Sequence, residues 1–273
     1  MMETSLPYAE VIGDPIAHSK SPLIHNFWLG KLNIDAQYRA CRVVAEELGD
    51  YFARRRDDAN WCGCNITIPH KIAALDHVSD PGGVRNTIGA INTVTHGPDG
   101  ILFGTNTDAA GFLGPILDVP LAKAPVILVG SGGAANAILF ALAQVGAGPV
   151  TILARNALKA AGLLARFGLK GEVKPLGSVL PPAALLVNAS PLGMKGQPPL
   201  ELDLSSLPDD AIVYDIVYAP LETGLLRTAR VRGLETVDGL EMLVGQAALA
   251  FELFFDVPPP EGCDEELRAM LVQ

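Results

Sequence analysis

The chain has 273 residues, enough for one large domain or two of modest size. Apolar residues make up 49% of it and charged residues 18%, which is typical of a compact globular protein and excludes a disordered one. The formal net charge is −10, so the overall field would repel nucleic acid and anionic membranes. An anionic substrate would therefore need local hydrogen-bond donors.

Cysteine usage predicts neither a metal site nor disulfides. The four cysteines are Cys41, Cys62, Cys64 and Cys263. They lack further Cys or His at ligand spacing, so we expect no zinc site and reduced thiols buried in a cytoplasmic protein. The N-terminus has no basic stretch followed by an apolar one, and no apolar run is long enough to span a bilayer. We therefore expect no signal peptide and no membrane partner.

The first part of the chain alternates predicted strands with helical stretches. The expected strands cover residues 8–12, 37–43, 61–66, 90–95 and 101–105. The expected helices cover residues 21–32 and 45–56. Ser21 is placed at the cap of the first helix and Pro22 in its first turn, where a missing N–H is tolerated. The last two strands would form a hairpin that turns at residues 97–100.

After residue 125 the strands become short, continuous and apolar, as in a parallel sheet buried on both faces. The expected strands of this part cover residues 126–129, 150–153, 185–188 and 212–215. A helix of small residues is expected at 136–145, and a strongly apolar one at 240–255. The alternation predicts an α/β protein with a doubly wound parallel sheet.

A glycine-rich loop joins the first of these strands to its helix. Gly130, Gly132 and Ala135 fit the pattern G-x-G-x-x-A. The first glycine permits a tight turn, the second lets a pyrophosphate approach the backbone, and the small third residue lets helix and strand pack closely. The N-terminus of the helix would offer N–H groups to phosphates. The alternative is a structural glycine turn without a ligand.

The end of the next strand indicates which dinucleotide is bound. An NAD enzyme carries an acid there, but this chain has Ala154, Arg155 and Asn156, with Lys159 shortly after. Arginine is suited to hold a 2′-phosphate, so the sequence favours NADP. Alternatively, Arg155 is an ordinary solvated cation.

Three polar motifs outside this region are candidates for chemistry. Alternation along the strand and its continuation would place Asn65, Thr67 and Pro69 on one face, followed by Lys71. Lys71 is either a proton-transfer group or a solvated lysine. Asp108 stands at a predicted helix start and is either a functional acid or an N-cap. Ser19 and Ser21 are cap residues or, in a cleft, hydroxyls that hold a carboxylate.

Taken together and in this order, the motifs resemble the shikimate dehydrogenase family along nearly the whole chain. The matching segments are residues 13–16 with the serine motif, 65–71, 89–93, 106–108, the glycine loop, 188–194, 215–218, 239 and 242–246. The family usually has Asn before the arginine and Thr after it, where this chain has Ala154 and Asn156. That departure weakens the phosphate site without supplying the acid that NAD needs.

The resemblance implies a role for each matching residue. Lys71 and Asp108 would be the catalytic pair, with Asp108 also near the substrate. Other substrate-binding residues would be Ser19 and Ser21 for a carboxylate, Thr67, Asn92 and Gln246 for ring hydroxyls, and Tyr218. Cofactor-binding residues would be Gly130, Ser131, Gly132, Gly133, Ala134, Ala154, Arg155, Asn156, Lys159, Ile216 and Gly239. The last two would lie by the nicotinamide half.

The resemblance also implies an architecture and a reaction. Residues 1–106 would form an α/β substrate-binding and catalytic domain, residues 107–238 an NADP-binding Rossmann domain, and residues 239–273 helices that return to the first domain. The chain would reversibly reduce 3-dehydroshikimate to shikimate with NADPH, in aromatic amino-acid biosynthesis, as a monomer or homodimer. No metal is implied.

Three alternatives remain open. A quinate or dual quinate/shikimate dehydrogenase shares the chemistry, but a bulkier residue in place of Ser19 or Ser21 would better fit the quinate branch. A non-catalytic NADP-binding sensor on the same fold would not need to keep both Lys71 and Asp108. A structural or interaction protein would not explain the paired cofactor and substrate motifs.

Overall fold

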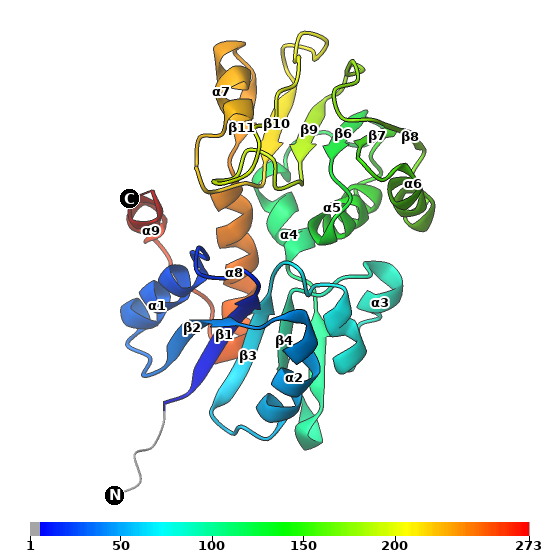
Figure 1. The fold of residues 1–273 in the computed structure, drawn as a ribbon. Coiled ribbons are helices and arrows are strands. Elements are labelled where there is room, and N and C mark those ends of the chain that lie inside the picture. Colours follow the sequence, from blue (N-terminus) through cyan, green and yellow to red (C-terminus); the bar gives the residue numbers. More distant parts are fainter. Residues whose placement is uncertain (1–5, 273) are drawn as a thin grey trace, which may run out of the picture. The chain divides into compact units, whose positions relative to one another are not determined.

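The computed structural model describes residues 6–272, which form two compact units. The N-terminal unit joins the chain up to Thr107 to the stretch from Val244 onward, and the central unit runs from Asp108 to Leu243. Each unit has its own sheet and its own apolar core (Figure 1).

The sheet of the N-terminal unit has five strands in the order β2-β1-β3-β4-β5. They are β1 (Tyr8–Gly13), β2 (Gln37–Arg42), β3 (Trp61–Ile66), β4 (Thr93–His96) and β5 (Leu102–Thr105). The first three are parallel, and β4 and β5 form the antiparallel hairpin that the sequence predicts. The expectation of strand from residue 90 is wrong, because the Ile91 N–H donates to the Lys71 carbonyl outside the ladder.

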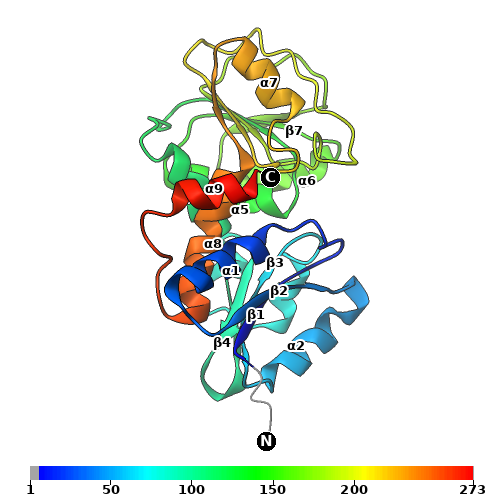
Figure 2. The same cartoon turned by 90° about the vertical axis from the view of Figure 1, so that its left-hand side faces the viewer.

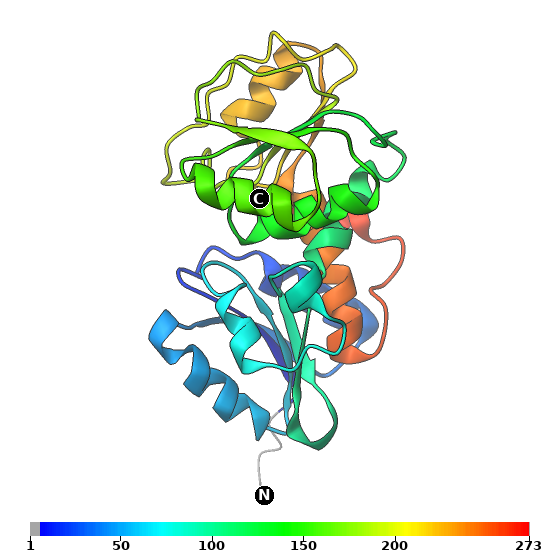
Figure 3. The same cartoon turned by 90° about the vertical axis from the view of Figure 1, so that its right-hand side faces the viewer.

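Successive side chains of β1 point to opposite faces of the sheet in the N-terminal unit, and each face is covered by a different helix. Ala9 and Val11 pack into an apolar cluster with Phe254 of α8 (Gly239–Phe255). Glu10 points to the opposite face, where it accepts hydrogen bonds from Tyr51 and Arg55 of α2 (Leu48–Arg56). Figure 3 shows α2 in blue and α8 in orange on opposite sides of this sheet.

The carboxylate of Glu10 is buried but remains ionised. Burial would raise its pKa, yet hydrogen bonds from Arg55, Tyr51 and Arg39 outweigh that effect and lower the pKa overall. A buried carboxylate needs such partners to remain charged. This polar cluster therefore belongs to the packing between α2 and the sheet.

Two helix boundaries of the N-terminal unit differ from the sequence-based expectations. Residues 45–47 form a short 3₁₀ helix before α2, so the expected helix at 45–56 is divided. Helix α1 (Ser21–Leu32) has Lys20 at its N-cap, so the prediction of Ser21 as the cap is wrong. α9 (Asp264–Leu271) packs beside α1, where Lys31 forms an ion pair with Glu266 (Figure 2).

The central unit contains a six-stranded parallel sheet in the order β11-β10-β9-β6-β7-β8. Its strands are β6 (Val126–Val129), β7 (Val150–Leu153), β8 (Gly171–Lys174), β9 (Leu185–Asn188), β10 (Ile212–Asp215) and β11 (Glu235–Val237). Read from the β8 edge, this is the 3-2-1-4-5-6 order of a dinucleotide-binding sheet. The doubly wound fold is confirmed. β8 and β11 were not predicted, because these edge strands are too polar to give an apolar run.

Helices and loops cover this sheet on both faces. Its helices are α4 (Asp108–Leu113), α5 (Gly133–Gln144), α6 (Ala157–Arg166) and α7 (Gly224–Val231). On one face, Ile127, Val129 and Val213 of the strands join Leu225 and Leu226 of α7 in the core. Helix α5 begins three residues before the expected start at residue 136, directly on the glycine loop. Within residues 6–272, no helix is long and apolar enough to cross a membrane.

Candidate active site

The predicted substrate residues of the N-terminal unit gather at one edge of its sheet. The loops after β1 and β3 leave the carboxyl ends of parallel strands. β4 runs antiparallel to β3, so its first residue lies at that same edge, as does the end of β5. In open α/β sheets this edge is where ligands bind.

The loop after β1 carries the two serines. The Ser19 N–H donates to the Ile16 carbonyl at 3.0 Å, and the Ser21 N–H donates to Ser19 Oγ at 3.3 Å. Ser21 is buried and opens α1 without capping it, while Ser19 lies two residues earlier in the loop. The two hydroxyls therefore stand beside the first turn of a twelve-residue helix, a position that favours an anion.

The segment from Thr67 to Lys71 is a tight turn and not a strand. β3 ends at Ile66, so the expected alternation through Thr67 and Pro69 is wrong. The Thr67 N–H donates to the Ile12 carbonyl at 2.9 Å, and the His70 N–H donates to the Thr67 carbonyl at 2.9 Å. The Ile68–Pro69 peptide is cis. A Cβ on Gly13 would lie 2.5 Å from the Thr67 methyl group, so glycine is needed there for this turn to pack against β1.

Lys71 is attached by its backbone to the segment that carries Asn92. Its carbonyl accepts the Ile91 N–H at 2.8 Å, and Asn92 is the next residue. His70 is buried, with Nε2 at 2.7 Å from the Val43 carbonyl, which fixes the turn just before Lys71. Lys71 itself is partly buried.

Asn92, Thr107 and Gln246 form a buried hydrogen-bonded cluster. Asn92 Oδ1 accepts the Thr107 backbone N–H at 2.7 Å, and Asn92 Nδ2 donates to Thr107 Oγ1 at 2.8 Å and to Gln246 Oε1 at 3.1 Å. Two of the predicted ring-hydroxyl ligands, Asn92 and Gln246, are thus in direct contact. Asp108 follows Thr107 in the chain and begins α4, so it is the first helical residue and not an N-cap.

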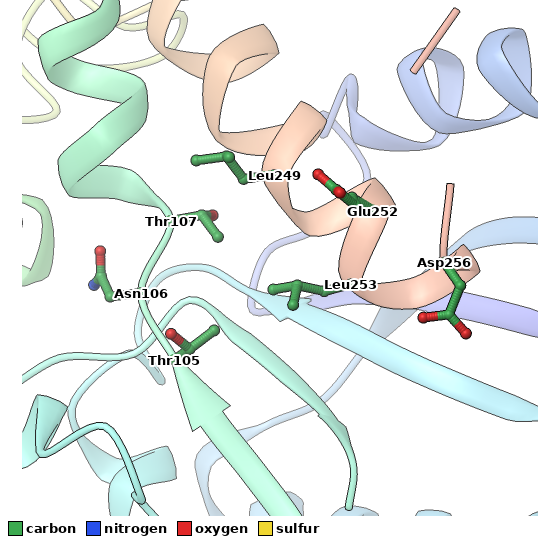
Figure 4. A pocket seen from close by; sticks show the side chains of 7 residues that line it. All are labelled: Thr105, Asn106, Thr107, Leu249, Glu252, Leu253 and Asp256. Atoms are coloured by element: carbon green, nitrogen blue, oxygen red, sulfur yellow. The ribbon is translucent and has the colours of Figure 1, made fainter. Parts of the chain in front are cut away.

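A groove of about 480 Å³ lies beside this cluster on the α8 side of the N-terminal unit. Figure 4 shows Leu249 and Leu253 extending from α8 toward Thr105 and Thr107. Its remaining lining residues are Asn106, Glu252 and Asp256. Two carboxylates without a cation among these described lining residues would repel an anionic substrate. The serine and lysine candidates are not among them either, so we do not assign the substrate to this groove.

The glycine loop of the central unit fits a pyrophosphate. Gly130 has φ of 106° and lies so close to Ala189 that a Cβ would come within 2.9 Å of its carbonyl oxygen. Gly132 is the N-cap of α5, and a Cβ there would meet only open space within 4 Å. Among the described residues, no side chain forms a capping hydrogen bond at this end of α5. Ser131, Gly133 and Ala134 complete a turn whose backbone is accessible at a helix N-terminus.

The end of β7 carries cations and no acid. Ala154 is buried, while Arg155, Asn156 and Lys159 are exposed. The Asn156 side chain accepts the Lys159 N–H at 2.9 Å and so caps α6. This capping places Lys159 in the first turn of the helix, on the same short segment as Arg155. Cations without an acid suit a phosphate group, whereas a pair of ribose hydroxyls would need an acid that accepts their hydrogen bonds.

The loops after β9 and β10 are joined by a buried carboxylate that the sequence reading did not single out. Asp215 accepts hydrogen bonds from Thr223 Oγ1 at 2.6 Å, Asn188 Nδ2 at 2.8 Å and the Val217 N–H at 3.0 Å. Burial raises its pKa, and these hydrogen bonds partly oppose that rise. Asp215 thereby fixes the start of the segment that carries Ile216 and the partly buried Tyr218.

Ile216 and Gly239 lie against each other in the central unit. A Cβ on Gly239 would come within 2.4 Å of the Ile216 carbonyl oxygen, so only glycine permits this approach of the first residue of α8. The structure thus brings together the two residues expected beside the nicotinamide.

The sequence reading missed residues that support the site through other side chains. Asn65 and Thr93 were part of matching motifs without a predicted role, Thr107 stood only beside Asp108, and Tyr38 gave no signal. As for metals, the described part of the chain contains no group of three His, Cys, Asp or Glu residues arranged to hold an ion.

Comparison with known families gives two matches. Residues 11–94 match the shikimate dehydrogenase substrate binding domain. Residues 239–267 match the shikimate 5′-dehydrogenase C-terminal domain. These segments contain the serine loop, the turn at Lys71 and the whole of α8.

Individual relatives are similar over the whole length. A protein of Sphingopyxis alaskensis named shikimate dehydrogenase (NADP(+)) is 65% identical over 266 residues, 97% of this chain and 97% of that protein. The structure of shikimate 5-dehydrogenase from Thermus thermophilus in complex with NADP(H) and shikimate is 37% identical, with a TM-score of 0.85 over 97% of this chain and 100% of that one. Quinate dehydrogenase from Corynebacterium glutamicum in complex with NAD is 28% identical, with a TM-score of 0.84 over 97% and 99%.

Proposed function

The chain belongs to the shikimate dehydrogenase family, and we propose that Lys71 and Asp108 carry the proton transfer of its reaction. It is an NADP-dependent oxidoreductase that interconverts 3-dehydroshikimate and shikimate, a step of aromatic biosynthesis. The observation that carries the assignment of residues is the convergence of the serine loop, the Lys71 turn and the Asn92 cluster at one sheet edge.

Substrate binding follows from the chemistry of these three groups. The hydroxyls of Ser19 and Ser21 beside the first turn of α1 suit the carboxylate of shikimate. The amides of Asn92 and Gln246 and the hydroxyl of Thr67 suit its ring hydroxyls. Tyr218 of the central unit would add a contact to the substrate. Local donors of this kind compensate for the net charge of −10.

Proton transfer accompanies the oxidation of one ring hydroxyl. In its neutral form, Lys71 Nζ accepts the hydroxyl proton during oxidation and returns it during reduction. Asp108 holds the lysine and the substrate in position and favours the charged lysine once the proton has moved. The bound cofactor supplies the hydride acceptor or donor.

The central unit would bind NADP through backbone and surface groups. Gly130 to Ala134 fit the pyrophosphate, and Arg155, with Asn156 and Lys159, fits the 2′-phosphate. Ala154 directly follows β7, and no acid stands at this position. Ile216 and Gly239 form a close-packed surface for the nicotinamide half.

We also propose the division of labour and the setting. The N-terminal part would bind substrate, the Rossmann part cofactor, and the C-terminal helices would belong to the first. The setting would be the cytoplasm, where thiols stay reduced. The four cysteines are free, but only Cys64 and Cys263 are buried, whereas Cys41 and Cys62 are partly exposed. The chain would act as a monomer or homodimer, which light scattering of the purified protein would measure.

A single assay tests the proposed substrate and cofactor preferences. Purified protein is mixed with shikimate or quinate and with NADP or NAD, and the absorbance of reduced nicotinamide is followed. We expect the highest kcat/KM with shikimate and NADP. A higher value with quinate would overturn the substrate preference, and NADP binding without turnover on either acid would indicate a sensor.

A further inference from the structure

Tyr38 is a buried tyrosine whose hydroxyl reaches across the sheet of the N-terminal unit. It lies on the edge strand β2, and its hydroxyl donates to Asn65 Oδ1 on β3 at 2.6 Å. Because β1 lies between these strands, the side chain must extend over β1 to make this bond. Tyr38 is 2% exposed, so the hydrogen bond is shielded from water.

The orientation of the Asn65 amide is set by a backbone group. Asn65 Nδ2 donates to the Asn92 carbonyl oxygen at 3.3 Å and to Thr93 Oγ1 at 3.1 Å. A carbonyl oxygen can only accept, so the amide nitrogen of Asn65 faces Asn92 and its oxygen faces Tyr38. The Tyr38 hydroxyl must therefore be the donor in its bond to Asn65.

The same reasoning fixes the Asn92 amide. Its Oδ1 accepts the Thr107 backbone N–H, which can only donate, and also accepts from Thr93 Oγ1 at 3.1 Å. Its Nδ2 therefore donates to Gln246 Oε1. The Gln246 amide is in turn oriented with its oxygen toward Asn92 and its donor nitrogen directed elsewhere.

These bonds form one hydrogen-bond chain of buried groups, in which every bond is donated in the same direction. It runs from the Tyr38 hydroxyl through Asn65, Thr93 and Asn92 to Gln246. Each member uses its donor on the next, so turning one amide over would place two acceptors or two donors against each other. This hydrogen-bond chain thus selects one orientation for the amides of Asn92 and Gln246, which the proposed function assigns to the ring hydroxyls.

Tyr38 is also attached to the helix that begins with the serine loop. Its ring stacks on His25 of α1 at a centroid distance of 3.9 Å and an interplanar angle of 5°. The Asn26 side chain accepts the Tyr38 N–H at 2.9 Å and donates to the Tyr38 carbonyl at 2.7 Å. Ser21 opens the same helix one turn before His25.

We propose that Tyr38 is a positioning residue for the substrate. It acts through Asn65 and Thr93 to hold Asn92 and Gln246 in the orientation that binds the ring hydroxyls. Its attachment to α1 keeps these amides in register with the serines that bind the carboxylate. The inference rests on the proposed roles of Asn92, Gln246 and the serines.

Tyr38→Phe tests this inference with the smallest change. The variant keeps the ring and its stack on His25 but leaves the buried Asn65 Oδ1 without its donor. Asn65 is then held only through its amide nitrogen, so its position against Thr93 and Asn92 is less fixed. We expect the KM for shikimate to rise about tenfold, the size of effect of one lost buried hydrogen bond. The kcat and the KM for NADP should change little, because the contact affects the bound and transition states alike.

Tyr51→Phe is the matched control. Tyr51 is equally buried and donates one hydrogen bond, at 2.8 Å, to Glu10 on the opposite face of the same sheet. It should lower the thermal unfolding midpoint as Tyr38→Phe does, yet leave the KM for shikimate unchanged. An equal rise in KM in both variants would show a general effect of stability and overturn the inference.

Thr93→Val interrupts the hydrogen-bond chain one step closer to Asn92 and leaves Tyr38 intact. It should reproduce the rise in KM, and Thr93→Ser, which retains the hydroxyl, should restore the parental value. This pair keeps the inference testable if Tyr38→Phe fails to fold. A parental KM in folded Thr93→Val would overturn it.

Asn92→Ala separates this inference from the proposed function. A raised KM in Asn92→Ala with a parental KM in Tyr38→Phe would mean that Asn92 binds substrate without help from Tyr38. Parental KM values in both would show that the assigned amide does not bind substrate, and the positioning role would fall with it.

Discussion

The candidate ligand-binding residues of the two units differ in their physical character. In the N-terminal unit, the candidate substrate residues are buried side chains joined by directed hydrogen bonds, as at Asn92 and Gln246. In the central unit, the candidate cofactor residues are backbone groups of the glycine loop and exposed cations such as Arg155. A small polyol is distinguished by its hydroxyls, which need amides of fixed orientation, whereas a pyrophosphate needs only N–H groups and positive charge.

This difference leads to different costs of substitution. A change in the buried cluster leaves polar groups without partners in a shielded site, and the loss is large. A change among exposed cations removes an interaction that solvent and salt already weaken. Substitutions in the N-terminal unit should therefore have larger effects on activity than those at the 2′-phosphate site.

Lys71→Ala should have the largest effect, because it removes the proposed proton-transfer group. General acid–base catalysis contributes typically about 10²–10⁴-fold, so we expect kcat to fall by that factor with little change in substrate affinity. The measurement is the steady-state rate at saturating substrate and cofactor. Lys31→Ala, which breaks a surface ion pair with Glu266, is the control and should keep parental kcat.

A kcat of Lys71→Ala within about threefold of the parent would exclude Lys71 as the acid–base group. Asp108→Asn should also lower kcat, and the two losses should be less than additive in the double variant because the residues act as a unit. Full additivity would mean that Asp108 acts independently of the lysine.

Ser19→Ala and Ser21→Ala should each raise the KM for shikimate by about ten- to a hundredfold, the value of a hydrogen bond to a charged group. The kcat should change little if the carboxylate is held equally in the ground and transition states. Ser205→Ala, at an exposed turn, is the control. Parental KM values in both serine variants would reduce these residues to structural elements of the loop.

The sequence predicted the fold where burial on both faces leaves an unambiguous signal. β6, β7, β9 and β10 begin and end at the expected residues because buried apolar residues make up all or most of each. β8 and β11 were missed because edge strands carry polar residues such as Glu172 and Glu235. Local pattern does not report pairing with a distant strand.

The sequence reading identified candidate residues but not what orients them. Lys71 and Ser19 stand in local motifs, and those motifs gave the expectation. Tyr38 contributes through Asn65, which is distant in the sequence, and a lone tyrosine in a strand has no distinctive spacing. β3 ends at Ile66 and the Thr67 carbonyl accepts the His70 N–H in a tight turn, which no period of two residues could indicate.

Arg155→Ala should have a smaller effect, on cofactor choice. Arg155 is exposed, so the loss should fall near the low end for a charge-assisted bond, about tenfold in kcat/KM for NADP. Use of NAD should remain nearly unchanged. Arg166→Ala, in the last turn of α6, is the control. An equal loss with both cofactors, or parental preference for NADP, would contradict the assignment of the 2′-phosphate site.

The smallest expected effect concerns stability against pH, and it has opposite signs in the two units. His25 is buried among aromatic rings, and neither ring nitrogen has a hydrogen-bond partner among the described residues. Burial lowers its pKa from 6.5 to about 3. Asp215 is buried in the central unit, where desolvation raises its pKa above 3.8.

The sign follows from proton binding. Between pH 6.5 and about 3 the unfolded chain protonates His25 and the folded chain does not, so acidification destabilises the N-terminal unit. Between about pH 8 and about pH 6 the loss is about 0.8 kcal/mol, rising to about 1.4 kcal/mol per pH unit below that. The lowered pKa of Glu10 adds a loss of the same sign only below its ordinary value of 4.5. For Asp215 the folded state binds the proton more tightly, so acidification through its titration range relieves a cost in the central unit.

Denaturant unfolding at each pH, with hydrogen exchange to report on each unit separately, measures this contrast. His25→Phe keeps an aromatic ring in the buried site and removes the titrating group, so its free energy of unfolding should change less between about pH 8 and about pH 6 than that of the parent. An identical slope in His25→Phe and the parent would mean that His25 is protonated in the folded protein. The stacked pair of His25 and Tyr38 would then carry a charge inside the aromatic cluster, which its burial makes costly.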